Sequence, residues 1–174
     1  MVILAPTASA IKEVHDIFIK QYGCSGYMCE GMVEGCLERA MTFVYDFKPF
    51  PKLFLKAGAI MYSFISFHPF VDANKRTAFE TTKLFLRLNG YELRANADEA
   101  VAFTKAIADF KITDINEIAQ WIKQRSKRTF SYTINCYLLK FVLNQYNKQL
   151  KLQPSAKIPN SIFLIANAVE IYPE

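Results

Sequence analysis

The sequence predicts a mainly helical fold: one domain followed by a C-terminal extension. In successive stretches the apolar residues recur three or four positions apart, which is the spacing of one face of an α-helix. Capping residues and glycines stand where these stretches are expected to begin and end. Only residues 41–50 alternate in the way a strand does. With 174 residues, of which 52% are hydrophobic, the chain is long enough to bury a substantial core.

The first helix is expected to begin at a cap on Thr7 or Ser9 and to end at Gly23. Its apolar stripe contains Ile11, Val14, Phe18 and Tyr22. His15 lies on the same stripe, so we expect a structural histidine that is hydrogen-bonded at the edge of the core. The glycine-rich residues 23–35 then form a loop into a second, short helix. One face of that helix carries Met32, Cys36 and Ala40.

Residues 41–50 have the pattern of a β-strand, because aromatic side chains occupy every second position. These side chains are Phe43, Tyr45 and Phe47, and they alternate with Thr42, Val44 and Asp46. Pro49 and Pro51 close the stretch. Because proline cannot donate a ladder hydrogen bond, the strand is expected at an edge or in a flap.

A third helix is expected to carry Pro51 in its first turn and to end before Pro69, since a residue that precedes proline disfavours helical geometry. Its apolar residues lie almost all round it, which predicts the central helix of the domain. They are Leu53, Ala57, Ile60, Phe64 and Phe67. A fourth helix follows from about Asn74 and stops at Asn89-Gly90.

Two more helices are expected before residue 128, one from the capping-box sequence Asn96 to Glu99 and one from Thr113. The inward positions of the first are Ala100, Phe103, Ile107 and Phe110, and those of the second are Ile115, Ile118, Ala119 and Ile122. Residues 132–152 suggest a further helix, and the apolar run 161–172 is either helix or strand. We therefore expect a domain at residues 1–128 and an extension at 129–174, which packs on the domain or builds a homodimer interface.

Composition and charge exclude several classes of protein. No apolar run is long enough to span a bilayer, and Met1 to Pro6 lacks the basic start of a secretory signal, so we expect a cytoplasmic protein without membrane contact. The four cysteines form no CxxC pair, which argues against a structural zinc site and for reduced thiols. The net charge of +5 is modest. The positively charged residues within 123–128 fit the solvent-exposed C-terminal end of a helix, where cations complement the helix dipole. We therefore interpret them as a helix end rather than a nucleic-acid-binding patch, and expect no nucleic-acid partner.

Candidate functional residues concentrate in His68-Pro-Phe-Val-Asp-Ala-Asn-Lys-Arg76, immediately before the fourth helix. The free N–H groups at a helix start bind phosphate, and Asn74, Lys75 and Arg76 would add an amide donor and two positive charges. Asp72 would repel bare phosphates, but it suits a Mg²⁺ ion that bridges them. These residue types therefore predict a site for a metal-nucleotide.

His68 stands beside this predicted anion site. An imidazole ring can accept a proton from an attacking hydroxyl, so His68 is a candidate base. Phe70 lies between the polar groups and is expected to point inward and pin the loop. The alternative is a helix-loop-helix in which these polar residues have no shared function. Each residue taken alone fits this alternative better, but the combination of all of them within nine positions argues against it.

This motif resembles the signature of the Fic/Doc superfamily, and specifically of its death-on-curing (Doc) branch. His15-Asp16, the glycine-rich loop, the aromatic flap and Leu86 to Gly90 are similar to Doc landmarks, so the resemblance covers about residues 8–126. It implies a Fic/Doc helical bundle with a small β-flap. It also implies that His68 is the base, that Asp72 is the Mg²⁺ ligand, and that the anion site consists of Asn74, Lys75 and Arg76.

Three positions depart from the pattern of Fic enzymes, which transfer AMP from ATP to a target hydroxyl. Ala73 and Lys75 replace the two glycines of Gly-Asn-Gly-Arg, and Phe79 replaces a second arginine. A lysine at the second position would occupy space that glycine leaves for a phosphate. All three departures favour the Doc branch, which is understood to bind ATP in the reversed sense and to pass its terminal phosphate to a threonine of elongation factor Tu.

The resemblance thus implies a translation-arresting toxin that uses ATP and Mg²⁺ and is restrained by a separate antitoxin, because no self-inhibitory Ser/Thr-x-x-x-Glu-Gly/Asn segment is evident. It also implies that the flap, which consists of Thr42, Phe43, Val44 and Tyr45, binds the backbone of the target protein as an added β-strand. A plain edge strand whose aromatic side chains pack on the domain fits the sequence equally well. Two alternatives stay open at this point. One is AMP transfer, and the other is a Fic-like interaction module without catalysis.

Overall fold

The structure is a computed structural model, which describes residues 2–24, 26–42, 49–129 and 169–173. The described residues form six helices and four short strands. The helices are α1 (Ala8–Tyr22), α2 (Met32–Met41), α3 (Leu53–Ser66), α4 (Asn74–Leu88), α5 (Ala97–Ala108) and α6 (Ile115–Gln124). The strands are β1 (Val2–Pro6), β2 (Tyr91–Leu93), β3 (Ser126–Arg128) and β4 (Val169–Pro173). The prediction of a mainly helical fold is confirmed.

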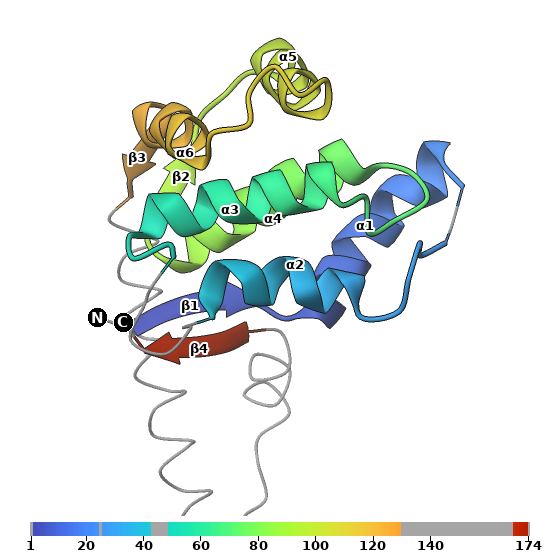
Figure 1. Cartoon of the computed structure of the whole chain (residues 1–174), viewed down its shortest axis with the longest axis horizontal. Helices are drawn as coiled ribbons and strands as arrows, with labels where there is room; N and C mark the ends of the chain where they lie inside the picture. The colour runs from blue at the N-terminus through green and yellow to red at the C-terminus, as the bar shows by residue number, and fades with distance from the viewer. Residues whose placement is uncertain (1, 25, 43–48, 130–168, 174) are drawn as a thin grey trace, which may run out of the picture.

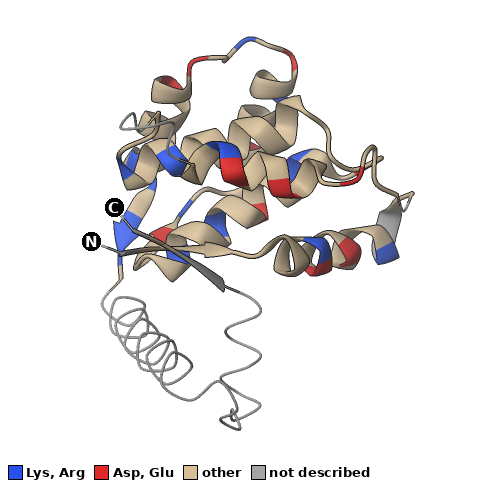
Figure 2. Cartoon of the chain, turned by 60° about the horizontal axis from the view of Figure 1, so that its bottom comes forward, with Lys and Arg blue, Asp and Glu red and all other residues tan. Residues whose placement is uncertain are grey.

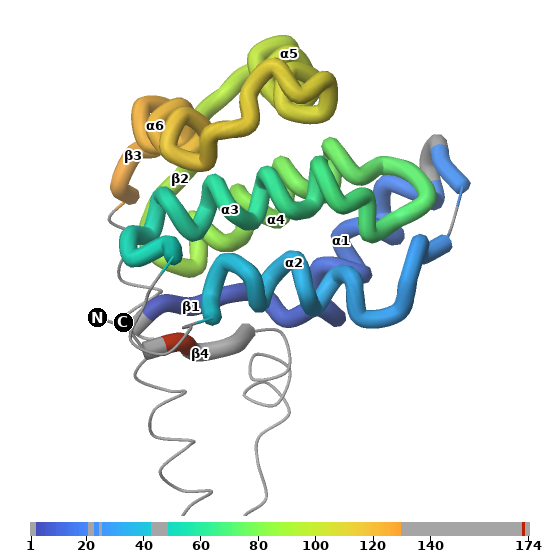
Figure 3. The backbone as a smooth tube through the Cα atoms, in the orientation of Figure 1, coloured from blue at the N-terminus to red at the C-terminus, as the bar shows by residue number. Residues whose placement is uncertain are grey.

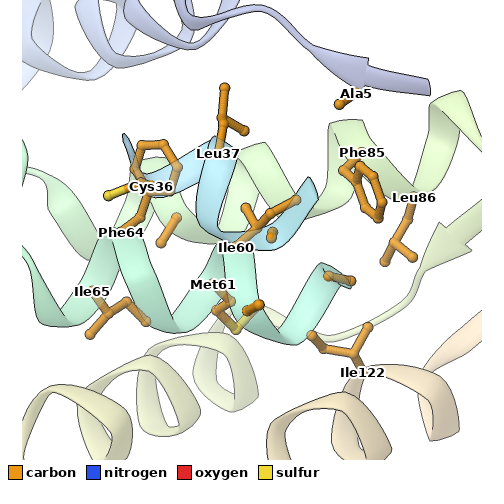
Figure 4. Close-up of a cluster of buried hydrophobic side chains, with 14 of the residues drawn as sticks. Ala5, Cys36, Leu37, Ile60, Met61, Phe64, Ile65, Phe85, Leu86 and Ile122 are labelled. Atoms are coloured by element: carbon orange, nitrogen blue, oxygen red, sulfur yellow. The ribbon is translucent and has the colours of Figure 1, made fainter. Parts of the chain in front are cut away.

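Helix α3 is the centre of the bundle, as its almost wholly apolar sequence predicts. It lies between α2 and α4 and is covered on its other side by α6 and α5 (Figure 1). Ten of its 14 residues are buried. A Cβ on Gly58 would come within 3.1 Å of the Ile115 carbonyl oxygen, so glycine allows the close approach of α3 to α6. Figure 4 shows Ile60 and Phe64 of α3 among side chains from the neighbouring elements.

Most helix boundaries follow the sequence signals. The Thr7 side chain accepts a hydrogen bond from the Ala10 N–H at 3.2 Å and so caps α1. The capping box at the start of α5 is formed in both directions, between Asn96 and Glu99. Other boundaries differ by a few residues. Pro51 precedes the N-cap of α3, which is Lys52, and the cap of α6 is Asp114 rather than a residue one position earlier.

The predicted inward position of Phe110 is wrong. Helix α5 ends at Ala108, and Phe110 has a left-handed backbone (φ 57°) and is 66% exposed. The helical spacing therefore no longer applies at this residue. The predicted solvated helix end at residues 123–128 needs a similar correction, since α6 stops at Gln124 and residues 126–128 form β3. The side chains of Lys127 and Arg128 are nevertheless exposed.

Two pairs of strands join distant parts of the chain, and the sequence did not predict their pairing. Antiparallel β1 and β4 bring the two ends of the chain together, with Leu4 opposite Ile171 (Figure 1). Antiparallel β2 and β3 follow α4 and α6. Of the run 161–172, which the sequence left as helix or strand, the described residues 169–172 belong to β4. The predicted helix 132–152 and most of the flap lie outside the described residues, and the division at 128/129 stays a prediction.

Charged residues of both signs are interspersed along the helices (Figure 2). Among the described residues no helix is long and apolar enough to cross a membrane. The connection between α3 and α4 lies beside the connection between α1 and α2 (Figure 3), and the two connections are joined by an antiparallel bridge between Tyr27 and Phe70. This junction of two loops carries the candidate site.

Candidate active site

The loop between α3 and α4 is bounded by two residues with left-handed backbones. His68 has φ 48° directly after the C-cap of α3, and Ala73, the N-cap of α4, has φ 55°. A residue with a Cβ pays about 1–2 kcal/mol for this conformation. Such backbone strain persists only where the surrounding structure imposes it, and it is concentrated at functional sites.

Phe70 anchors the middle of this loop in the core. It is fully buried, and its ring stacks on His15 of α1 with the ring centroids 3.7 Å apart and the planes 11° from parallel. Tyr27 and Phe64 approach the same ring at 5.6 and 6.4 Å. The structure therefore places Phe70 where the sequence analysis expected it, inside the protein between polar neighbours that face outward.

Asn74 holds the backbone of the same residue. Its carboxamide oxygen accepts from the Phe70 N–H at 3.0 Å, and its Nδ2 donates to the Phe70 carbonyl at 2.7 Å. The side chain is 7% exposed. From the sequence we expected this amide to donate to a phosphate, whereas in the structure its oxygen and its nitrogen both bind the Phe70 backbone. Asn74 therefore shapes the loop from the first turn of α4.

A second strip of backbone supports the loop from the other side. The Val71 N–H donates to the Gly26 carbonyl at 3.1 Å, and the Met28 N–H donates to the Pro69 carbonyl at 3.0 Å. A Cβ on Gly26 would lie 2.9 Å from the Val71 side chain, and its φ is +147°. Sequence reasoning missed this contact. The density of glycines in residues 23–35 was the available signal that the backbone there approaches another segment closely.

The loop opens into a cavity of about 320 Å³ between the end of α1 and the start of α4. Its lining includes Phe18, Gly23, His68, Asp72, Lys75 and Arg76. Asn74 also contributes to the lining, so all five polar residues that the sequence singled out in the motif border one space. This volume is near the lower end of the range of roughly 300–1,000 Å³ found for small-molecule sites.

The start of α4 offers unpartnered donors to this cavity. Its N-cap is Ala73, and no side chain caps it. The first backbone bond from α4 to the cap runs from the Thr77 N–H to the Ala73 carbonyl at 2.9 Å, so the N–H groups of residues 74–76 have no partner within the helix. Lys75 and Arg76 in this turn are exposed. The arrangement suits an anion, because donors, helix dipole and side-chain charges act together.

His68 and Asp72 occupy the rim of the cavity and are both exposed. Nδ1 of His68 lies 3.3 Å from the Ser66 carbonyl oxygen. A carbonyl can only accept, so Nδ1 carries the proton in this contact and the other ring nitrogen, Nε2, is left as a base. One oxygen of Asp72, Oδ1, accepts from the Ala73 N–H, and the other, Oδ2, lies next to Gly23.

A magnesium ion fits these residues only as a partner of phosphates. Among the described residues no group of three or more His, Cys, Asp or Glu side chains could hold a metal ion. Mg²⁺ is commonly bound through one or two carboxylates together with substrate phosphates and water. Asp72 beside the donors of α4 matches that pattern, so the carboxylate and the helix start would hold a metal-polyphosphate together.

His15 lies beneath the loop and does not line the cavity. It is 2% exposed, and its Nδ1 is 3.1 Å from Oγ1 of the buried Thr77. Burial lowers the pKa of His15, while the nearby carboxylates of Asp16 and Asp72 act in the opposite direction. The imidazole is therefore neutral at neutral pH. The buried, hydrogen-bonded position is the one that the sequence analysis expected.

The flap residues are only partly within the described chain. Thr42 is the exposed C-cap of α2, where its N–H donates to the Glu38 carbonyl at 2.7 Å. Phe43, Val44 and Tyr45 lie outside the described residues. Phe79, at the position of the missing second arginine, packs partly buried against the core, and the Lys83 ammonium group lies 5.7 Å from its ring centre.

Comparison with known proteins agrees with this geometry. The model of the Fic/DOC family matches residues 5–86, a span that contains α1 to α3, the loop and most of α4. The chain is also 37% identical over 68 residues to Toxin Doc of Mycolicibacterium smegmatis. The matched part of the chain is thus similar to the Fic/Doc superfamily. Within it, the similarity to Toxin Doc supports the Doc branch, which the replacements at Ala73, Lys75 and Phe79 had favoured.

The match to Toxin Doc covers 39% of this chain and 52% of that protein, so the chain spans about half the length of the curated relative it matches. Helix α3, the loop and most of α4 fall within the residues that match the family model. Residues His68 to Arg76 therefore lie inside the part of the chain that matches the family model.

Proposed function

We propose that this protein is a Doc-like toxin that transfers the terminal phosphate of Mg-ATP to a hydroxyl group of a target protein. One observation carries the proposal: a base and an uncapped, doubly cationic helix start face the same cavity. By resemblance to the Doc branch the target is a threonine of elongation factor Tu, and its modification arrests translation. A separate antitoxin would restrain the protein.

In this mechanism the chain supplies position, charge and a proton acceptor. Nε2 of His68 takes the proton from the target hydroxyl as its oxygen attacks phosphorus, a contribution of roughly 10² to 10⁴-fold. Asp72 would hold Mg²⁺, which when bound would offset the negative charge of the phosphates; the leaving group of the transfer is ADP. Lys75, Arg76 and the N–H groups of the first turn of α4 bind the phosphate oxygens. Asn74 keeps the loop in shape.

AMP transfer is the alternative that one specific observation keeps open. Ala73 adopts the left-handed backbone (φ 55°) at the position where Fic enzymes carry glycine, so the turn of the loop is available in this chain as well. The exposed side chain of Lys75 then becomes the main local difference. Because it projects from the first turn of α4, it favours a pose in which the terminal phosphate, rather than the α-phosphate, approaches His68.

The test compares the wild-type protein with His68→Ala. Each is incubated with ATP, Mg²⁺ and either purified elongation factor Tu or a bacterial proteome, and the products are weighed by mass spectrometry. A phosphate-sized gain that His68→Ala abolishes supports the proposal. An AMP-sized gain replaces it with nucleotidyl transfer. No gain in any proteome, with nucleotide binding intact, leaves a non-catalytic Fic-like module.

A cellular experiment tests the toxin assignment separately from the chemistry. Expression of the wild-type chain without an antitoxin should arrest growth, and Asp72→Ala should remove the arrest while the variant accumulates to the same level. Normal growth with the wild-type chain would contradict the toxin assignment.

A further inference from the structure

His15 is the one buried histidine of the described chain, and the proposed chemistry does not use it. Its Nε2 is buried and has no hydrogen-bond partner among the described residues, which destabilises the folded state. A leucine or phenylalanine would fill the same space without that cost. The position of the ring, rather than its volume alone, is therefore the feature to explain.

The ring joins three elements at the candidate site. His15 extends from α1, stacks on Phe70 of the loop and contacts Thr77 in α4. The parallel stack at 3.7 Å fixes the distance of Phe70 from α1, and the contact with Thr77 fixes the rotation of the imidazole about its own bond. Asn74 then holds the Phe70 backbone from the other side.

Phe70 stands midway between the two reactive groups of the loop. His68 precedes it by two residues and Asp72 follows it by two, so a shift of Phe70 would move the base and the carboxylate together. Misplacement of a reacting group by about 1 Å can reduce catalysis roughly 10²-fold. A contact that locks Phe70 thus controls the geometry of both groups at once.

We propose that His15 is a positioning residue, whose flat ring on Phe70 and bond to Thr77 hold the loop in the geometry that transfer requires. The expected effect of His15 on the rate of transfer rests on the proposed function, whereas its effect on the position of the loop does not. The charged groups that face the ring are Asp16 on its own helix and Asp72 on the loop, and burial nevertheless lowers its pKa. The ring therefore stacks in its neutral form.

Three variants separate positioning from general packing. His15→Leu keeps an apolar side chain but loses the flat ring. His15→Phe combined with Thr77→Val keeps a flat ring and leaves no polar atom unpaired. Phe85→Leu is the control: Phe85 is equally buried in the core (Figure 4), but it lies about three turns along α4 from Asn74. All three should unfold cooperatively, so that their unfolding free energies can be compared.

The first readout is amide hydrogen exchange at Phe70 and Val71, whose N–H groups bond to Asn74 and Gly26. We expect exchange at these two amides to accelerate at least 10-fold in His15→Leu. It should stay near the wild-type rate in the Phe/Val double variant and in Phe85→Leu. This readout needs no catalysis, so it tests the contact even if phosphate transfer is wrong.

The second readout is the rate of target modification. In His15→Leu, kcat should fall about 10- to 100-fold with a smaller change in the KM for ATP, because the loop is displaced while the start of α4 still binds phosphate. The double variant should recover most of kcat. Equal losses in His15→Leu and Phe85→Leu, or unchanged exchange at Phe70 in His15→Leu, would overturn the proposal.

Discussion

Two asparagines at opposite ends of α4 allow a sharp test of how the site is built. Asn74 binds the N–H and the carbonyl of Phe70 in the loop, and Asn89 binds the N–H and the carbonyl of Leu4 in β1. Asn89 also donates to the Phe85 carbonyl at 2.8 Å. The same type of side chain thus makes the same kind of backbone clamp at both ends, but only one clamp is at the candidate site.

The perturbation is Asn74→Ala, compared with Asn89→Ala. Each backbone group that is left buried without a partner costs about 1–3 kcal/mol, so the loss of two at Phe70 lowers the unfolding free energy by roughly 2–4 kcal/mol once some water entry is allowed. Asn89 makes three hydrogen bonds, but it is more exposed, so each lost bond costs near the lower end of that range. Asn89→Ala should therefore lower the unfolding free energy by roughly 2–3 kcal/mol. The unfolding free energy of a typical domain is about 5–15 kcal/mol, so both variants should still fold.

The assay measures stability and transfer in the same preparations. Urea unfolding gives the free energy for each variant, and mass spectrometry gives the rate of target modification without denaturant. We expect similar losses of stability, but a rate lower by about 10²-fold in Asn74→Ala and within about threefold of wild type in Asn89→Ala. If Asn74→Ala transfers as fast as Asn89→Ala, the loop does not need this clamp and the reasoning fails.

The remaining predictions concern product, strain, pH and thiols. Lys75→Gly should shift the product toward an AMP-sized mass gain, and unchanged product mass would contradict our account of that side chain. Ala73→Gly should raise the unfolding free energy in urea titrations by up to about 1 kcal/mol, because glycine adopts φ 55° without strain. Burial lowers the pKa of His15, so the unfolded chain binds a proton at this residue more readily than the folded chain does. The contribution of His15 to the unfolding free energy is therefore fully present above about pH 6.5 and is lost as the pH falls toward the pKa of the folded state. The His15→Phe/Thr77→Val variant should lose less unfolding free energy over that pH range. Burial raises the pKa of Cys36 to about 12, so iodoacetamide at pH 8 should label the exposed Cys24 well before it, as peptide mass spectrometry would show.

Local signals in the sequence predicted the helices well, because each helix begins and ends through contacts within a few residues. The Asn96 to Glu99 capping box and the Thr7 cap both form as expected. Two predictions failed, one at a local helix end and one where a distant strand paired. Phe110 kept the helical spacing but fell beyond the end of α5, and residues 126–128 followed a helix but paired with β2.

The candidate site divides in the same way. The residue types of His68 to Arg76 indicated a base, a metal-type carboxylate and an anion site. The structure brings all five of these polar residues to one cavity: His68, Asp72, Asn74, Lys75 and Arg76. The role of Asn74 could not be predicted from its position, because an amide side chain at a helix start can bind either a phosphate or the backbone of the preceding loop. The support from residues 26–28 was also missed, since backbone hydrogen bonds leave little trace in side-chain identity.

The sequence by itself determined the class of fold, the positions of the helices and the chemistry available between α3 and α4. Those features depend on apolar spacing, on caps and on residue types that stand within nine positions of one another. Only the tertiary structure decided that α1 sets the loop through His15 and Phe70, and that β4 returns to β1. Such contacts join residues far apart in the chain, and their energy depends on distance and orientation, which no local pattern specifies.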